Sequence, residues 1–94
     1  MSYYTYIITN RYNKVIYIGV TKDLKRRLLE HREKRYKNSF SARYNLQKLV
    51  YFEIHKTTEA ARKREILIKK WNREWKEVLI NEMNPDWNDL DWIL

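Results

Sequence analysis

The sequence predicts a small α+β protein, within the broad α/β class, in which helices flank a three-stranded antiparallel sheet in the order β-β-α-β-α-α. Two aromatic and β-branched runs separated by an Asn-rich turn open the chain, and a third such run lies near its middle. Apolar residues at helical spacing dominate much of the remainder. The 94 residues fit one modest core, so we expect a single domain over residues 1–94.

The first part of the chain is expected to form a hairpin followed by a helix. Residues 3–9 and 15–20 are rich in Tyr, Ile, Val and Thr, as strands are. The turn at 10–13 contains two Asn, which tolerate left-handed backbone conformations. Thr21 is an acceptable helix cap, and we expect the helix to run from there to about Arg35.

The second part is expected to alternate a strand with helices. Residues 38–45 are polar and irregular, which is typical of a loop, and 47–55 form a third β-rich run. Helical spacing covers 58–82, with a possible break near Asn72, and the chain's only proline follows. The tail, 87–94, is expected to pack back on the domain, and the four tryptophans are interpreted as core and tail packing.

The charge of the chain is concentrated in its first half. Residues 1–50 hold 12 basic and 3 acidic side chains, whereas residues 51–94 hold 8 and 9. The whole net charge of +8 therefore comes from one half of the chain. Such asymmetry favours a polyanionic partner, nucleic acid before membrane, over a protein that is merely basic.

Other classes of protein are disfavoured by what the sequence lacks. There is no apolar run long enough to span a membrane and no basic, apolar leader at the N-terminus, so we expect neither a membrane protein nor a signal peptide. Cysteine is absent, whereas small secreted domains often depend on disulfides. We therefore expect a cytoplasmic protein.

Short motifs surround the only glycine, Gly19. Tyr-Thr-Tyr occupies 4–6 on the first predicted strand, and Tyr-Ile-Gly occupies 17–19 at the end of the second. A Lys- and Arg-rich helix start at 21–27 comes next, followed by Glu-His at 30–31. A lone glycine in this position serves backbone freedom or close approach of another group. In this order and spacing, the chain resembles the GIY-YIG nuclease family.

The resemblance covers nearly the whole chain, from Tyr4 to about Leu90. The sequence looks most similar to the short stand-alone members and to the N-terminal nuclease domain of the bacterial excision-repair incision subunit. Tyr4 and Thr5 stand where the family name has Gly and Ile, and Tyr6 keeps the motif tyrosine. The string at 63–71 is similar to the helix that carries the metal-binding glutamate in the stand-alone group.

This resemblance implies an endonuclease that hydrolyses a nucleic-acid phosphodiester with Mg²⁺ or Mn²⁺ as cofactor, with DNA favoured over RNA. It implies that the two motif tyrosines lie on adjacent strands, facing the helix that carries Arg27. Tyr17 would act as the general base, and Glu65 would bind the metal. The implied catalytic residues are Tyr6, Tyr17, Arg27, His31, Glu65 and Asn84.

The chemistry of these side chains fits the implied roles. Arg27 and His31 are four residues apart and share one helix face at the edge of the apolar stripe, whereas Arg26 points about 100° away. The planar fork of an arginine matches phosphate oxygens. A single carboxylate suffices for Mg²⁺ when water and phosphate complete its shell. The ordinary tyrosine pKa, about 10, requires nearby positive charge if Tyr17 is to act as a base.

Two assignments stay open in the sequence. Strict helical phasing places Arg64, rather than Glu65, near the centre of the apolar face, so the motif match alone selects Glu65. Asn84 either orients a group of the active site or caps the helix that ends before Pro85.

Basic side chains of the first half are expected to contact the nucleic-acid backbone: Lys22, Lys25, Arg26, Arg32, Lys34 and Arg35. One alternative function is a catalytically inactive nucleic-acid-binding module of the same fold. Another is an adaptor that docks an acidic protein. A protein partner could also supply target choice, because a domain of this size has no room for a separate sequence-reading module.

Overall fold

Three antiparallel strands form one sheet in the computed structural model of the chain, which describes residues 2–94. β1 (Tyr3–Thr9) and β2 (Ile16–Thr21) pair as the predicted hairpin. β3 (Lys48–His55) pairs with the other edge of β1, so the strand order is β2-β1-β3 with the N-terminal strand in the centre. The predicted sheet and element order are confirmed.

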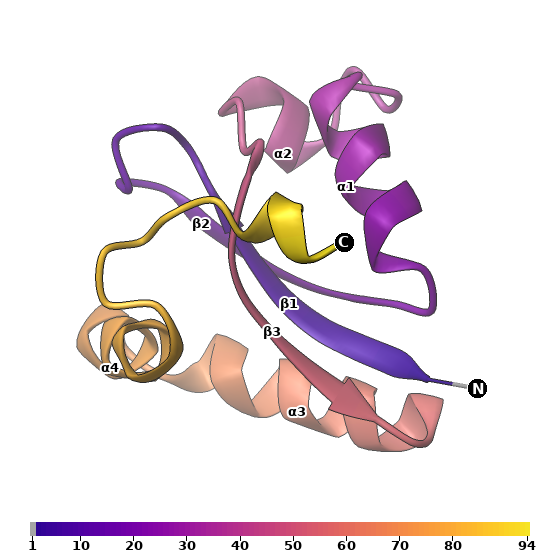
Figure 1. Cartoon of the computed structure of the whole chain (residues 1–94), viewed down its shortest axis with the longest axis vertical. Helices are drawn as coiled ribbons and strands as arrows, with labels where there is room; N and C mark the ends of the chain where they lie inside the picture. The colour runs from indigo at the N-terminus through magenta and orange to yellow at the C-terminus, as the bar shows by residue number, and fades with distance from the viewer. Residues whose placement is uncertain (1) are drawn as a thin grey trace.

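Helices cover both faces of this sheet (Figure 1). α1 (Leu24–Arg32), the one-turn α2 (Phe40–Arg43) and the short 3-10 helix η1 (Leu90–Ile93) lie on one face. α3 (Thr58–Lys70) and α4 (Arg73–Met83) lie on the other. Within residues 2–94, none of these helices has the length and apolar character needed to cross a membrane.

Side-chain caps decide where the helices begin. Asn72 Oδ1 accepts a 2.9 Å hydrogen bond from the backbone N–H of Trp75, which starts α4 and confirms the predicted break. The predicted start of α1 at Thr21 is wrong, because Thr21 is the last residue of β2. Asp23 caps α1 instead, accepting a 3.1 Å bond from the backbone of Arg26. Aspartate is the stronger capping residue of the two.

The segment after α1 also differs from the prediction. α1 ends at Arg32, about one turn earlier than expected, because Lys34 takes a left-handed conformation with φ 54°. The expected loop at 38–45 contains α2, whose first turn is capped by the side chain of Ser39. A helix of one turn is too short to show apolar periodicity, so only this cap signals it in the sequence.

Alternation along β1 divides the core into two clusters, one on each face of the sheet. Tyr6 and Ile8 point toward α1, whereas Ile7 points toward α3 and α4. The buried members on the α1 face are Tyr6, Ile8, Leu24, Leu28, Leu46, Leu49 and Leu90. Those on the α3 face are Ile7, Ile18, Val50, Tyr51, Ile68 and Ile80.

The tail returns to the domain as expected and buries Leu90 in the cluster on the α1 face. The interpretation of the tryptophans is right only in part. Trp71 and Trp87 pack at the edge of the core on the α3 face, whereas Trp75 and Trp92 are exposed.

Candidate active site

The two motif tyrosines lie side by side on the α1 face of the sheet. Tyr6 is paired with Gly19 across the hairpin, and Tyr17 is paired with Ile8. Residues two apart on a strand share a face, so both rings project toward α1. Their centroids are 6.5 Å apart, and each is 5.9 Å from the imidazole of His31 on α1. The arrangement expected of the motif tyrosines is therefore present.

Gly19 is required because the side chain of Tyr6 approaches it closely, and not because its backbone needs the conformational freedom of glycine. Its φ is not positive, so an L-residue could adopt its backbone conformation. A Cβ at this position would lie 2.5 Å from the hydroxyl oxygen of Tyr6 and 2.6 Å from Cζ. The tyrosine ring therefore crosses directly over the glycine, and any larger residue displaces it.

His31 is buried and fixed at both ring nitrogens. Nε2 lies 2.9 Å from the Tyr6 hydroxyl, and Nδ1 lies 2.8 Å from the hydroxyl of Ser41 on α2. Burial, together with the positive charge of Arg27, lowers the pKa of His31 to about 4. The imidazole is therefore neutral at pH 7.

Hydrogen-bond chemistry gives this chain of groups a direction. The guanidinium of Arg27 only donates, and its Nε lies 3.3 Å from the Tyr6 oxygen. The Tyr6 O–H is then free to donate to Nε2 of His31, and Nδ1–H donates to Ser41. Burial raises the pKa of Tyr6 to about 12, although Arg27 opposes the shift. Tyr6 is consequently a neutral hydroxyl at pH 7.

Arg27 and Arg26 occupy different environments, as the helical spacing predicts. The Arg27 side chain is 28% exposed and that of Arg26 is 71% exposed. Arg27 Nη1 donates to Glu30 at 3.2 Å, and its guanidinium lies over the ring of Tyr36. Burial alone would lower the pKa of Arg27, but its hydrogen bonds to Tyr6 and Glu30 raise it. The arginine is held in place and stays charged.

Glu65 reaches the same region from α3, which packs against β1 and β2. Its carboxylate is buried and pairs with Lys69 at 3.0 Å and with Arg62 at 3.6 Å. Lys69 Nζ in turn lies 5.8 Å from the ring centroid of Tyr17. The negative charge of Glu65 contributes to the raised pKa of Tyr6. Glu65 therefore lies close enough to Tyr6 to influence it electrostatically.

The prediction that Arg64 lies at the centre of the apolar face of α3 is wrong, because the buried residues of this helix are Ala61, Glu65 and Ile68, and Arg64 is half-buried beside them. Its Nε donates to both carboxylate oxygens of Glu53 on β3, at 3.0 and 2.9 Å, and its guanidinium lies over the ring of Trp71. Glu53 also accepts from the hydroxyl of Tyr51. Arg64 thus ties α3 to the sheet, while Glu65 beside it is buried.

The sequence of this site matches a known family. Residues 2–78 match the family model described as the GIY-YIG catalytic domain. The chain belongs to the GIY-YIG family. The matched residues include both motif tyrosines, Arg27, His31 and Glu65, and they end before Asn84. At the level of the family, the fold is that of a nuclease catalytic domain.

Two relatives of similar length support the assignment to short GIY-YIG proteins. A UPF0213 protein of Syntrophus aciditrophicus (strain SB) is 34% identical over 83 residues, which cover 88% of this chain and 93% of the relative. The solution NMR structure of a UPF0213 protein from Bacillus halodurans is similar with a TM-score of 0.58 and 25% identity. That comparison covers 95% of this chain and 93% of the other.

The donor set of this GIY-YIG site fits a divalent cation that brings most of its own ligands. Residues 2–94 contain no cluster of three or more His, Cys, Asp or Glu side chains that could hold a metal ion. Glu65 offers one buried carboxylate, paired with the exposed cations Lys69 and Arg62. Mg²⁺ commonly binds through one or two carboxylates and completes its shell with water and phosphate.

Asn84 lies outside the GIY-YIG site, and the structure supports the capping alternative. It is the C-cap of α4 and is buried. Its Nδ2 donates to the carbonyls of Val50, at 3.1 Å, and Asn88, at 2.8 Å, while its Oδ1 accepts from the backbone of Asn88. The side chain therefore anchors the tail to β3.

The basic residues predicted to bind nucleic acid divide into two groups. Arg32 serves the fold, because its Nε donates to the carbonyl of Gln47 and its Nη atoms pair with Asp89 at 2.5 Å and Asp91 at 3.1 Å. The remaining side chains are exposed on the α1 side of the molecule: Lys22, Lys25, Arg26, Lys34 and Arg35. The predicted role in binding is therefore kept for these five and withdrawn for Arg32.

Two residues to which the sequence assigned no role, Glu30 of the Glu-His motif and Ser41, support the site. Glu30 fixes Arg27 and also attracts Arg26 and Arg35. Ser41 fixes His31 from a segment that resembles a loop in the sequence. The spacing of Glu30 three residues after Arg27 was a usable signal, because such pairs face each other on a helix.

Replacing Gly19 by Ala is expected to lower cleavage at least tenfold and to destabilise the fold by about 1–3 kcal/mol, as overpacking does. The new Cβ occupies the position of the Tyr6 hydroxyl, so the tyrosine moves and breaks its bonds to His31 and Arg27. Chemical denaturation gives the free energy of unfolding. In a Tyr6→Leu background, which lacks the ring atoms that the Cβ meets, the same substitution should cost less, and equal costs in both backgrounds would contradict the proposed clash.

Proposed function

We propose that the chain is a divalent-metal-dependent endonuclease that hydrolyses phosphodiester bonds of DNA. The observation that supports this proposal is the convergence of Tyr6, Tyr17, Arg27 and His31 on one face of the sheet, with Glu65 on α3 close enough to Tyr6 to influence it electrostatically. Arg27 holds a positive charge against the Tyr6 hydroxyl, and Glu65 offers a buried carboxylate from α3. A phosphate and its cation need both charges.

In this mechanism Arg27 binds the non-bridging oxygens of the scissile phosphate. Its charge neutralises the negative charge that develops when water attacks phosphorus. Tyr6 and Glu30 hold the guanidinium at two of its nitrogens, so little reorganisation accompanies the reaction. His31 acts through Tyr6, because its ring is neutral at pH 7 and both of its nitrogens are engaged.

Tyr17 is the proposed general base. The attacking water gives its proton to the Tyr17 phenolate while the new O–P bond forms and the P–O bond to the leaving strand breaks. Lys69, which pairs with Glu65, lies 5.8 Å from the centroid of this ring. A Mg²⁺ or Mn²⁺ ion at Glu65 would polarise the phosphate and stabilise the leaving oxygen.

Nicking of supercoiled plasmid tests the proposal directly. The full chain is incubated with plasmid in Mg²⁺, in Mn²⁺ and in EDTA, and the circular nicked and linear forms are separated on a gel. Nicking with either cation and none in EDTA is expected. If the plasmid is bound and shifts on the gel but stays supercoiled with both cations, the chain is better described as the inactive binding module than as a nuclease.

A further inference from the structure

A row of aromatic rings leads away from Tyr17 onto α2. The ring of Phe40 is stacked on Tyr17 with an interplanar angle of 30° and a centroid distance of 6.3 Å. The ring of Tyr44 lies 4.7 Å from Phe40. The three rings, Tyr17, Phe40 and Tyr44, form what is called here the aromatic row. It begins at the proposed general base and ends at the surface.

The aromatic row is not part of the core. Phe40 is 47% exposed and Tyr44 is 44% exposed, whereas Ser41 and Ala42 between them are buried. α2 therefore turns its small residues inward, where Ser41 holds His31, and its large rings outward. Exposed rings forgo the stabilisation that burial would give them, which points to a ligand that covers them.

The surroundings of the aromatic row select an anionic ligand. Residues 34–48 contain five Lys or Arg and no Asp or Glu. Arg43 is exposed on the same turn of helix as the rings. An aromatic surface lined with positive charge is the usual platform for nucleic-acid strands, whose bases stack while their phosphates contact the cations.

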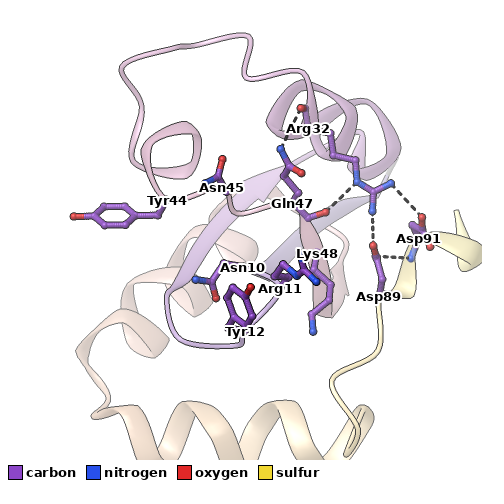
Figure 2. A pocket seen from close by; sticks show the side chains of 10 residues that line it. All are labelled: Asn10, Arg11, Tyr12, Arg32, Tyr44, Asn45, Gln47, Lys48, Asp89 and Asp91. Carbon is purple, nitrogen blue, oxygen red and sulfur yellow. Dashed lines mark hydrogen bonds and ion pairs between the residues drawn. The ribbon is translucent and has the colours of Figure 1, made fainter.

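A pocket of about 570 Å³ continues from the end of the row. Tyr44 lines one side of it, and Arg11, Tyr12 and Lys48 gather on another, as Figure 2 shows. The acidic residues in its lining, Asp89 and Asp91, both pair with Arg32, which offsets one of their two charges. With Arg11 and Lys48 the lining carries a net charge of +1, which suits a further phosphate of the same strand.

We propose that Phe40 and Tyr44 bind an unpaired nucleobase next to the scissile phosphate, so that the substrate class is a strand with unpaired nucleotides beside the cut. A base inside a duplex has both faces covered by its neighbours and has none to offer to a protein ring. An unpaired base stacks on any aromatic surface with little dependence on sequence. This inference rests on the proposed nuclease function, because it places the base relative to Tyr17.

The test measures binding separately from cleavage. Anisotropy of a labelled single-stranded oligonucleotide and of a blunt duplex of equal length is recorded in EDTA for the wild type, Phe40→Ala and Phe40→Leu. Loss of base stacking should weaken single-strand binding about tenfold in both variants, since Leu keeps apolar bulk but has no π face. Duplex affinity should change less than twofold. Trp75→Ala, which removes an equally exposed ring from α4, should alter neither.

A double-mutant cycle locates the base. A single abasic nucleotide is moved along the oligonucleotide, and at one position its effect and that of Phe40→Ala should not add, because the two partners of one contact have been removed. Any of three results would overturn the proposal. The losses of affinity could add at every abasic position, Phe40→Leu could bind single strands like the wild type, or the variants could lose equal affinity for duplex and single strand. If α2 docks a protein instead of a base, the binding of oligonucleotides by Phe40→Leu should be unchanged, which is one of these results.

The outcomes also separate this proposal from the nuclease function. Coupling at one abasic position without nicking in Mg²⁺ or Mn²⁺ would support the stacking site and contradict the proposed endonuclease activity. Nicking without coupling would support the endonuclease activity and contradict the stacking site.

Discussion

Glu65→Gln should abolish detectable cleavage while nucleic-acid affinity stays within a few fold. Glutamine keeps the size of the side chain but removes the single negative charge that the site offers to a cation. Substrate binding depends on the basic surface of the α1 side and the nearby loops, so it should persist. Nicking rates in a Mg²⁺ titration and anisotropy in EDTA measure the two properties independently.

Glu59→Gln provides the matched control, because Glu59 lies exposed in the first turn of the same helix. It should cleave like the wild type. Both variants should unfold at nearly the wild-type temperature, since the partners of Glu65 are exposed and such ion pairs contribute about 0–1 kcal/mol. Full activity of Glu65→Gln would exclude the proposed metal site.

Arg27→Ala should lower the single-turnover rate at saturating substrate by roughly two to three orders of magnitude, as removal of one preorganised electrostatic donor does elsewhere. Arg27 is held by Tyr6 and Glu30, and its guanidinium is the charge nearest to the tyrosine hydroxyls. Arg27→Lys should recover little of this loss, because an ammonium lacks the planar fork that binds two phosphate oxygens.

Arg26→Ala is the control for this helix. Arg26 is largely exposed and points away from the site, so its loss should weaken binding and reduce the salt slope by about one unit. The saturated rate should change little. A salt series of binding and single-turnover measurements compares the variants. If both alanine variants lose affinity and neither shows a lower rate at saturating substrate, α1 is only a basic binding face. The binding module is then the better interpretation.

The hairpin and the residues it carries could be predicted because their signals are local. Alternation along β1 and β2 sets which residues share a face, and the antiparallel register brings Tyr6 over Gly19. A spacing of four residues puts Arg27 and His31 on one side of α1. These relations follow from backbone geometry alone, so a sequence is enough to reveal them.

Other features depend on contacts between distant segments, which local patterns do not encode. Arg32 carries the same charge as its neighbours on α1, but Asp89 and Asp91 reach it from the far end of the chain. Helical phasing favoured Arg64 for the centre of the buried face of α3, but Glu65 lies there, and Arg64 pairs at its margin with Glu53 on β3. A basic residue can be identified in a sequence, but the acidic side chain that pairs with it is known only from the fold.

The strand order has a consequence for how the protein is made. β1 is synthesised first but lies in the centre of the sheet, so one of its edges stays open until β3 leaves the ribosome. A nascent chain that ends before α3 already carries Tyr6, Tyr17, Arg27 and His31 but lacks the carboxylate of Glu65. Translation itself therefore delays completion of the site, and a prematurely terminated chain would lack the carboxylate proposed to bind the metal.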